Sequence, residues 1–373
     1  MTDARAWVDV DLDAVRANYR TVRDRARPRV GVVPMVKANG YGLGAASIVR
    51  ALDPMGPWGY GVAAAAEGAA LRELGVDRPV VVFSPLPPGD VALAADAGLT
   101  ATISDLGGLS RWVAAARSDR PLDFHVEIDT GMGRCGFDWR SVDAWAGAVV
   151  EHASESARWT GVYTHFHSAD EADAAPSRLQ WERFESALVQ LPIGRETLVV
   201  HAANSAASVR WPEYGLDLVR PGIFLYGVPA TEDRAAPRPQ PVAAVRARLV
   251  LVRDVPKGST VGYGADHVAQ RDERWGTLDI GYGDGYPRAL GNRGYALVKG
   301  RRVPILGRIS MDLTVVDLTE VADAQVGDVV TLIGTDGGEE IRVEEVAKQA
   351  GTIGYEILTG LGHRLPRVER GGG

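Results

Sequence analysis

The sequence predicts an α/β protein that consists of a (β/α)8 TIM barrel followed by a mainly β C-terminal domain. Three observations support this prediction. Eight short apolar runs rich in β-forming residues alternate with helix-like stretches through the first two-thirds of the chain. A proline-rich polar stretch follows Tyr226, and beyond it apolar and polar residues alternate with a period of two. Strands that alternate with helices build parallel sheets, and eight such units close a barrel.

The elements are expected in the following order. A strand in "AWVDVDL" near the N-terminus is expected to join the second domain, and a helix follows from about Leu12 to Arg25. The barrel strands are then expected in the run that ends at Lys37 and at 58–63, 79–84, 100–104, 123–129, 159–166, 197–204 and 216–222. The segment "PATEDRAAPRPQP" is typical of a linker. We therefore expect an N-terminal strand over 1–10, a barrel over 11–235 and a β-domain over 236–373.

Composition limits the classes of partner. The net charge of −7 is spread over interleaved acidic and basic residues, so no basic stripe is available for nucleic acid or an anionic membrane. No run of 18 apolar residues is present, and the first residues lack the pattern of a signal peptide, so we expect a cytoplasmic protein. A single cysteine, Cys135, allows no internal disulfide and no cysteine-cluster metal site.

Polar and charged side chains with possible catalytic or binding roles come at the carboxyl ends of several expected strands. Because the carboxyl ends of barrel strands meet at one rim, these residues are expected to lie close together: Lys37, Arg134, His165, His201, Asn204, Ser205 and Arg220. The segments "NSAAS" and "RPGI" add free backbone N–H groups and a hydroxyl, which is the composition of a phosphate site. The sequence therefore predicts a phosphate-binding pocket with a lysine beside it.

Each residue has an ordinary structural interpretation when it is taken alone. Lys37 could simply mark the point where a strand leaves the core, Arg220 could be a strand-end cation, and a single histidine is commonly a satisfied core residue. Together, a lysine near a phosphate site with two histidines and two arginines indicates a phosphorylated carbonyl cofactor held as a Schiff base. Pyridoxal 5'-phosphate is the obvious candidate, because a desolvated amine can attack its aldehyde.

Eight ordered motifs resemble those of the alanine racemase family, whose members are pyridoxal-phosphate enzymes with a barrel, a C-terminal β-domain and a homodimeric assembly. The resemblance covers nearly the whole chain. The motifs are "MVKANGYGLG", "EIDTGMGRCGF", "YTHFHSAD", "HAANSAASVRWPEYGLDLVRPGIFLYG", "VGYGADH", "LDIGYGDGYPR", "GRISMDLTVVDL" and "IGYEILTGLGHRLPRV".

The resemblance implies two catalytic bases and a cofactor site. Lys37 would carry the cofactor and act as one base, and Tyr263 of the partner subunit would act as the second base on the opposite face. Two bases suit racemisation, because a planar carbanion must lose a proton on one side and regain one on the other. Arg220 would face the pyridine nitrogen with support from His165. The remaining cofactor contacts would come from Tyr41, Asn204, Ser205, Gly222, Ile223 and Tyr355.

The resemblance also implies a substrate site and shows one departure from the family pattern. Arg134 and Met311 would take the substrate carboxylate, while Asp312, Tyr282 and Tyr355 would shape the entrance. His201 and Glu127 would support the site. Many members carry a lysine, often carbamylated, where this chain has Glu127. We hypothesise that Glu127 supplies the anion directly and pairs with Arg134.

These features favour a racemase that interconverts L- and D-alanine and supplies D-alanine for peptidoglycan. A racemase of serine or another small amino acid is an alternative, because Glu127 alters the substrate pocket. A non-catalytic carrier of pyridoxal phosphate is an alternative of another class, although it would need neither Tyr263 nor Met311. Related barrel lyases would bring a metal site in the second domain, where this chain has only His267 and His363, so we expect no metal.

Overall fold

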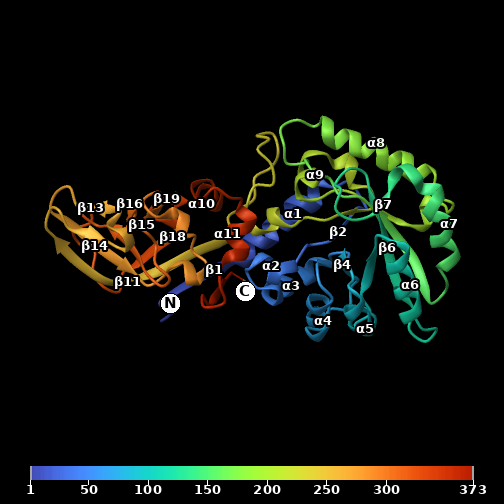
Figure 1. Ribbon diagram of the computed structural model, residues 1–373, viewed down its shortest axis with the longest axis horizontal. Coiled ribbons are helices and arrows are strands. Elements are labelled where there is room, and N and C mark those ends of the chain that lie inside the picture. The colour runs from blue at the N-terminus through green and yellow to red at the C-terminus, as the bar shows by residue number, and fades with distance from the viewer. Residues whose placement is uncertain (1, 372–373) are drawn as a thin grey trace.

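The computed structural model describes residues 2–371, in which eight short parallel strands form the wall of a barrel (Figure 1). Their spatial order is β2-β10-β9-β8-β6-β5-β4-β3, and a single parallel bridge between Met35 and Gly61 joins the two ends of the sheet. The strands are β2 (Gly31–Val32), β3 (Tyr60–Val62), β4 (Val80–Pro85), β5 (Thr100–Ile103), β6 (Leu122–Asp129), β8 (Ala157–Tyr163), β9 (Val199–His201) and β10 (Leu218–Val219), with β7 (Phe137–Asp138) paired to β6. The predicted barrel and its eight strands are confirmed.

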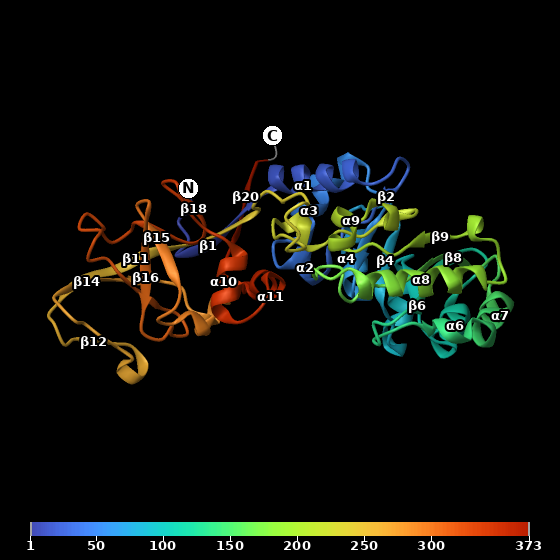
Figure 2. The same ribbon diagram turned by 90° about the horizontal axis from the view of Figure 1, so that it is seen from above.

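Helices cover the outside of this sheet, as both ribbon views show (Figures 1 and 2). The first runs over the predicted residues because Asp11 accepts a hydrogen bond from the N–H of Ala14 and so caps its start. The helices of this part are α1 (Leu12–Arg25), α2 (Lys37–Tyr41), α3 (Ala45–Leu52), α4 (Ala65–Glu73), α5 (Val91–Asp96), α6 (Leu106–Ala115), α7 (Val142–His152), α8 (Ala175–Val189) and α9 (Ser205–Arg210).

The C-terminal part is built on a second sheet with the order β19-β18-β15-β16-β17-β14-β11-β1-β20. The N-terminal strand belongs to it, because β1 pairs antiparallel with β11 and parallel with β20. The strands are β1 (Ala6–Asp11), β11 (Ala243–Val255), β14 (Glu273–Leu278), β15 (Tyr295–Val298), β16 (Arg301–Leu306), β17 (Thr314–Asp317), β18 (Val329–Asp336), β19 (Glu339–Ile341) and β20 (Arg367–Arg370). Helices α10 (Val343–Ala350) and α11 (Gly354–Gly360) lie between this sheet and the barrel (Figure 1).

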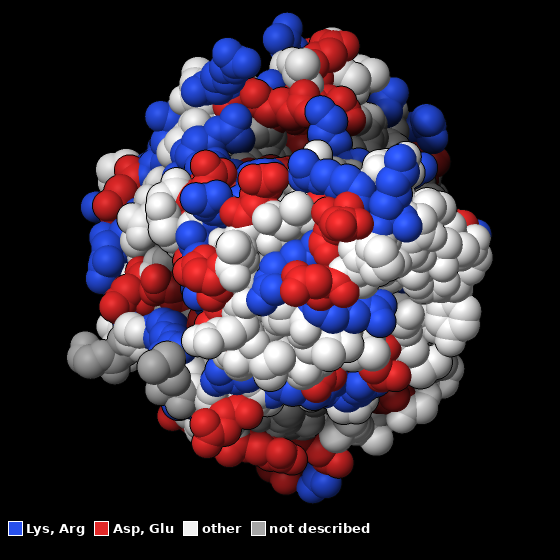
Figure 3. Space-filling model, turned by 90° about the vertical axis from the view of Figure 1, so that its left-hand side faces the viewer, with Lys and Arg blue, Asp and Glu red and all other residues white. Residues whose placement is uncertain are grey.

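A separate two-stranded hairpin, β12 (Thr260–Val261) and β13 (His267–Val268), projects from the second sheet on the side away from the barrel (Figures 1 and 2). We call residues 260–268 the arm. The face of the molecule at this end mixes acidic and basic residues (Figure 3). Within residues 2–371, no helix is long and apolar enough to cross a membrane, and no three His, Cys, Asp or Glu side chains are grouped to hold a metal ion.

Candidate active site

Most of the residues expected to carry chemistry meet in one pocket at the carboxyl ends of the barrel strands. Ten of the expected residues line it: Lys37, Tyr41, Glu127, Arg134, His165, Asn204, Ser205, Arg220, Gly222 and Tyr355. Tyr355 comes from α11 of the C-terminal part, and its ring centroid lies 6.1 Å from that of Tyr41. The pocket is therefore built mainly by the barrel, with one tyrosine from beyond it.

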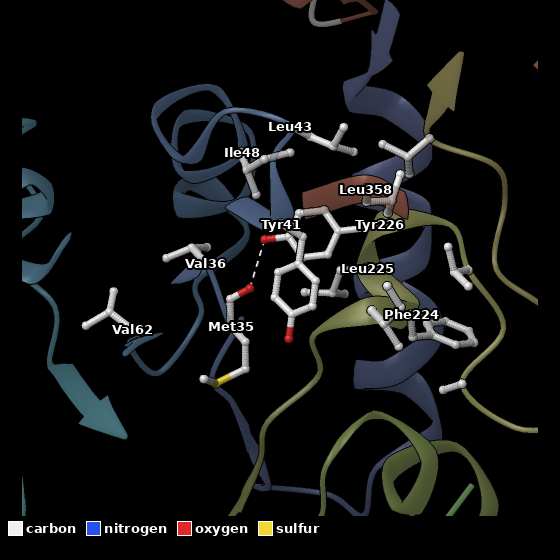
Figure 4. Packing of buried hydrophobic residues seen from close by; sticks show 14 of the residues in the cluster. Met35, Val36, Tyr41, Leu43, Ile48, Val62, Phe224, Leu225, Tyr226 and Leu358 are labelled. Atoms are coloured by element: carbon white, nitrogen blue, oxygen red, sulfur yellow. Dashed lines mark hydrogen bonds between the residues drawn. The ribbon is translucent and has the colours of Figure 1, made fainter. Parts of the chain in front are cut away.

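Lys37 stands at the start of a left-handed turn. Ala38, Asn39 and Tyr41 have φ angles of 52°, 53° and 52°, a conformation that costs roughly 1–2 kcal/mol for each residue with a side chain. The ring of Tyr41 stacks on Tyr226 with centroids 4.5 Å apart, and the Tyr226 hydroxyl donates to the carbonyl of Met35 at 2.8 Å (Figure 4). Packing of this kind supports the strained turn.

The environment of Lys37 favours its neutral amine. Burial lowers the pKa of Lys37 below its usual value, and the nearby cations Arg134 and Arg220 lower it further, while the carboxylate of Glu67 acts in the opposite direction. A neutral amine is the form that attacks an aldehyde. Burial and the two arginines thus shift the pKa of Lys37 in the direction that a Schiff-base lysine needs.

The expected phosphate site is formed by three segments. The hydroxyl of Ser205 accepts a hydrogen bond from the N–H of Gly222 at 2.7 Å, and Asn204 caps α9 by accepting from the N–H of Ala207 at 3.1 Å. A Cβ atom at Gly222 would lie 2.1 Å from the Tyr41 hydroxyl, so only glycine fits there. Ile223 is fully buried beside it. The close approach of hydroxyls to backbone N–H groups suits a phosphate group and therefore fits pyridoxal phosphate beside Lys37.

Arg220 is a buried cation with its guanidinium aimed at histidines and carbonyls. It is 4% exposed, its Nη1 donates to Nδ1 of His201 at 2.7 Å, and its Nη2 lies 3.3 Å from Nδ1 of His165. Nη2 also donates to the carbonyls of Thr164 and Ala202 at 3.0 and 3.2 Å. Burial lowers the pKa of Arg220 to about 10, so it stays charged at neutral pH. A pyridine nitrogen placed against it would meet a donor that keeps its proton.

The hydrogen bonds of Arg220 also fix the protons of two buried histidines. Because Arg220 donates to Nδ1 of His201, the proton of that ring lies on Nε2, which donates to Nδ1 of His125 at 3.0 Å. Burial lowers the pKa of His125 to about 3 and that of His201 well below 6.5, with the charge of Arg220 as a second cause. Burial likewise lowers the pKa of His165 well below its usual value. All three rings are neutral near pH 7.

The expected direct pair between Glu127 and Arg134 is wrong for this structure. Both side chains line the pocket, but among residues 2–371 no ion pair joins them. Glu127 is 4% exposed and accepts a hydrogen bond from the hydroxyl of Ser104 at 3.4 Å. Burial raises the pKa of Glu127, while Tyr163 and Arg134 oppose that rise. The short side chain of Glu127 turns to a neighbouring strand end instead of reaching the arginine.

Four expected residues lie outside the pocket, on loops of the C-terminal part. Tyr263 in the arm is 71% exposed, Met311 is 54% exposed and Tyr282 is 42% exposed. The N–H of Gly283 donates to the carbonyl of Met311 at 2.8 Å, which holds the loops of Tyr282 and Met311 together, and Asp312 forms an ion pair with Arg364 at 2.7 Å. A single chain therefore does not bring these residues to the pocket around Lys37.

Sequence reasoning missed several residues of the pocket wall. Met35, Phe83 and Tyr163 line the pocket, and His125 lies behind it. A signal was present for two of them, because alternate residues of a strand share a face. His125 precedes Glu127 by two residues, and Tyr163 precedes His165 by two, so each shares an inward face with a residue that the sequence analysis had selected.

Comparisons with known proteins agree with this geometry. The models of the alanine racemase N-terminal and C-terminal domains match residues 10–230 and 242–369. An alanine racemase from Carboxydothermus hydrogenoformans is 40% identical over 97% of this chain and 98% of its own length. The chain belongs to the alanine racemase family. Alanine racemases are pyridoxal-phosphate-dependent isomerases, which confirms the predicted enzyme class and cofactor.

Solved alanine racemases share the whole fold. The crystal structure of the enzyme from E. faecalis aligns with a TM-score of 0.92 at 31% identity and covers 98% of both chains. The enzyme from Bartonella henselae, solved with covalently bound pyridoxal phosphate, aligns with a TM-score of 0.89 at 30% identity and covers 98% of this chain and 100% of that one. The predicted combination of barrel and β-domain is the fold of this family.

Proposed function

We propose that this protein interconverts L- and D-alanine with pyridoxal phosphate bound at Lys37. The observation that carries the proposal is the meeting, in one pocket, of a half-buried lysine amine, a hydroxyl-lined phosphate site and a buried arginine. The alanine racemase of Bartonella henselae holds its pyridoxal phosphate covalently, and the present pocket offers Lys37 for the same purpose. When bound, the cofactor supplies an electron sink for the pair left at the α-carbon after deprotonation.

The residues of the chain divide the work between binding and proton transfer. Lys37 moves the α-proton on one face, and Arg134 binds the substrate carboxylate. Arg220 would face the pyridine nitrogen of a bound cofactor and leave it unprotonated, which would limit the electron withdrawal of the ring and favour simple proton exchange over other reactions. Tyr41, Ser205 and the backbone around Gly222 would hold the phosphate, with Tyr355 at the rim.

The second base is Tyr263, and a homodimer brings it to the site. Tyr263 and Met311 are exposed on the C-terminal part, where their own chain gives them no place in the pocket. A second copy related by a two-fold axis can exchange these residues reciprocally, so that each barrel receives the arm of its partner. A carrier without turnover would have no use for such an arm.

The single, partly buried cysteine suits a reducing compartment, and we place the enzyme in the cytoplasm, where its product would feed peptidoglycan synthesis.

An alternative substrate is favoured by one specific observation, the position of Glu127. Because Glu127 bonds to Ser104 and forms no ion pair with Arg134, the anchoring of the substrate carboxylate differs from the expected one, and serine or another small amino acid becomes a candidate substrate.

The assay that tests the proposal supplies purified protein with L-alanine, L-serine and larger amino acids and measures formation of the D-enantiomer. We expect the highest kcat/KM with alanine. The matched Lys37→Ala variant is expected to lose the visible absorbance of the bound cofactor and to lower racemisation by at least about 10³-fold, since the covalent attachment and one base are removed together. Racemisation of serine alone would favour the alternative, and an unchanged absorbance in Lys37→Ala would place the cofactor on another lysine.

A further inference from the structure

The left-handed turn after Lys37 needs support from outside itself. Two of its residues, Ala38 and Asn39, are exposed and have positive φ angles, so core packing does not hold them. Asn39 is held locally, because its Oδ1 accepts a hydrogen bond from the N–H of Ala45 at 3.0 Å. Tyr41 is held by its stacking on Tyr226. The carbonyl of Ala38, which directly follows Lys37, accepts a hydrogen bond from the N–H of Gly42 at 2.8 Å, but the N–H of Ala38 is bonded from outside the turn.

Glu67 provides that support from a neighbouring helix. One oxygen of its carboxylate accepts a hydrogen bond from the N–H of Ala38 at 2.6 Å. The other accepts from the N–H groups of Ala63 and Ala64, at 2.9 and 3.2 Å, at the start of α4. A carboxylate between backbone N–H groups makes charge-assisted hydrogen bonds that are shorter and stronger than neutral ones. The Glu67 side chain is therefore hydrogen-bonded to two backbone segments, the turn after Lys37 and the start of α4.

The two contacts of Glu67 lie on either side of the point where the barrel wall closes. Strand β2 has only two residues, and beyond it the Met35–Gly61 bridge and the backbone hydrogen bonds from Gly61 N–H to Pro34 and from Val36 N–H to Gly61 join the first and second barrel strands. Lys37 follows this bridge on one side, and α4 begins shortly after it on the other. Glu67 therefore ties together the two segments that leave the closing point of the barrel, and one of them carries the amine.

We propose that Glu67 is a positioning residue that holds Ala38 in the left-handed conformation and so sets the amine of Lys37 in the pocket. This inference rests on the proposed function only in taking Lys37 as the site of cofactor attachment. Glu67 does not line the pocket, and it reaches Lys37 through the backbone and through its charge, which opposes the lowering of the Lys37 pKa. Substitution of Glu67 should therefore change the position of the Lys37 amine and leave the substrate site at Arg134 unchanged.

The test compares Glu67→Ala with Glu73→Ala in the holoenzyme. Glu73 is an exposed glutamate at the end of the same helix and serves as the matched control. In Glu67→Ala we expect kcat for alanine to fall about tenfold, the scale of one lost charge-assisted hydrogen bond, with KM changed less than twofold. Release of pyridoxal phosphate by hydroxylamine should become faster by a similar factor, because the amine is held less firmly. Glu73→Ala should match the wild type in all three measurements.

A second substitution separates positioning of Lys37 from simple capping of α4. Glycine adopts positive φ angles without the penalty of a Cβ atom, so Ala38→Gly in the Glu67→Ala background should recover at least half of the lost kcat and slow the hydroxylamine reaction again. Capping of α4 would not be rescued in this way, because the N–H groups of Ala63 and Ala64 still lack their acceptor. If Glu67→Ala does not fold, Glu67→Gln replaces it, with a smaller loss and the same rescue expected.

The outcomes distinguish this inference from the proposed function. A double variant as impaired as Glu67→Ala, or a fall in thermal stability with kcat and hydroxylamine rate unchanged, would reduce Glu67 to a helix cap. If the wild type racemised no amino acid, the hydroxylamine rates would still report how firmly Lys37 is held. The proposed function would then fail while the inference about Glu67 could still be supported or overturned.

Discussion

The barrel pocket and the arm of the C-terminal part differ in the burial of their functional side chains. In the pocket, Arg220 is 4% exposed and its guanidinium is held by two histidines and two backbone carbonyls. In the arm, Tyr263 is 71% exposed and lies between Gly262 and Gly264, which have φ angles of 69° and 80°. The pocket is organised inside one chain, whereas the arm points its tyrosine outward.

This difference matches the distribution of roles that the proposed function requires. In that proposal the barrel would supply the cofactor attachment, the phosphate site and one base. The arm would supply the second base from a projecting hairpin, to a second copy of the chain. Changes in the pocket are therefore expected to act within one subunit, and changes in the arm are expected to act in its partner.

The largest effect is expected from the arm, in Tyr263→Phe. The resemblance to the family assigns Lys37 to the D-enantiomer and Tyr263 to the L-enantiomer. In heavy water this variant should still exchange the α-hydrogen of D-alanine with retention, while inversion and exchange from L-alanine fall by roughly 10²-fold or more, the usual scale for the loss of a positioned general base. Equal loss of exchange from both enantiomers would mean that Tyr263 supports the cofactor and moves no proton.

Mixing the two inactive variants tests whether the arm acts in the partner. A dimer of one Lys37→Ala chain and one Tyr263→Phe chain has one site with both bases intact. Random reassortment of equal amounts makes half of the dimers mixed, with one of two sites active, so roughly a quarter of the wild-type specific activity should return. No recovery after demonstrated subunit exchange would place Tyr263 and Lys37 of the same chain in one site.

The sequence predicted the pocket better than the arm, for physical reasons. The barrel strands and the rim residues follow from apolar runs that end at polar residues, a local pattern that the fold leaves unchanged. The left-handed turn at Ala38 and Tyr41 could not be predicted, because it depends on Glu67 and Tyr226, which are distant in the sequence. The pairing of Glu127 with Arg134 failed because the reach of a side chain depends on its rotamer and neighbours. Only the family resemblance pointed to Tyr263, since an exposed turn tyrosine has no local signal.

The next prediction concerns the buried histidines of the barrel and the way in which the free energy of unfolding depends on pH. His125 and His201 have pKa values that burial depresses in the folded chain, so they bind protons only after unfolding. Their contribution to stability is present above the unfolded pKa of about 6.5 and is lost as the pH falls below it. Between pH 6.5 and 5.5 the free energy of unfolding should fall by roughly 1 kcal/mol for each of the two rings.

Urea unfolding at the two pH values measures this loss. His125→Gln keeps an acceptor for the Nε2–H of His201 and removes one titrating ring, so its loss of stability over this interval should be smaller by roughly 1 kcal/mol. His152→Gln removes an exposed ring from α7 and is the control, with the wild-type pH dependence expected. A His125→Gln variant with that same dependence would show that His125 takes up its proton in the folded state.

A smaller effect is expected at Glu127, inside the pocket. Because no ion pair joins Glu127 to Arg134, Glu127→Gln should raise the KM for alanine by less than the tenfold that loss of a charge-assisted bond worth about 1.5 kcal/mol would produce. Glu127→Lys should regain the wild-type KM when bicarbonate is supplied, provided that the lysine becomes carbamylated. A KM increase beyond tenfold in Glu127→Gln would indicate that the pair does form when substrate is bound.

The smallest effect is expected from the ion pair beside Tyr263. Asp266 pairs with Arg308 through the Nε and Nη2 atoms of the guanidinium, with 3.2 Å from Nη2 to Oδ1, but the two side chains are 35% and 45% exposed. Exposed pairs contribute about 0–1 kcal/mol, so Asp266→Asn should lower kcat/KM less than about fivefold.

Gly264→Ala should lower kcat/KM more than Asp266→Asn does, since a Cβ atom there would lie 2.8 Å from Asp266 and the φ angle of 80° disfavours any side chain. Steady-state kinetics measure kcat/KM for the two variants. A larger loss of kcat/KM in Asp266→Asn than in Gly264→Ala would mean that the ion pair determines the shape of the arm more than the backbone conformation around Tyr263 does.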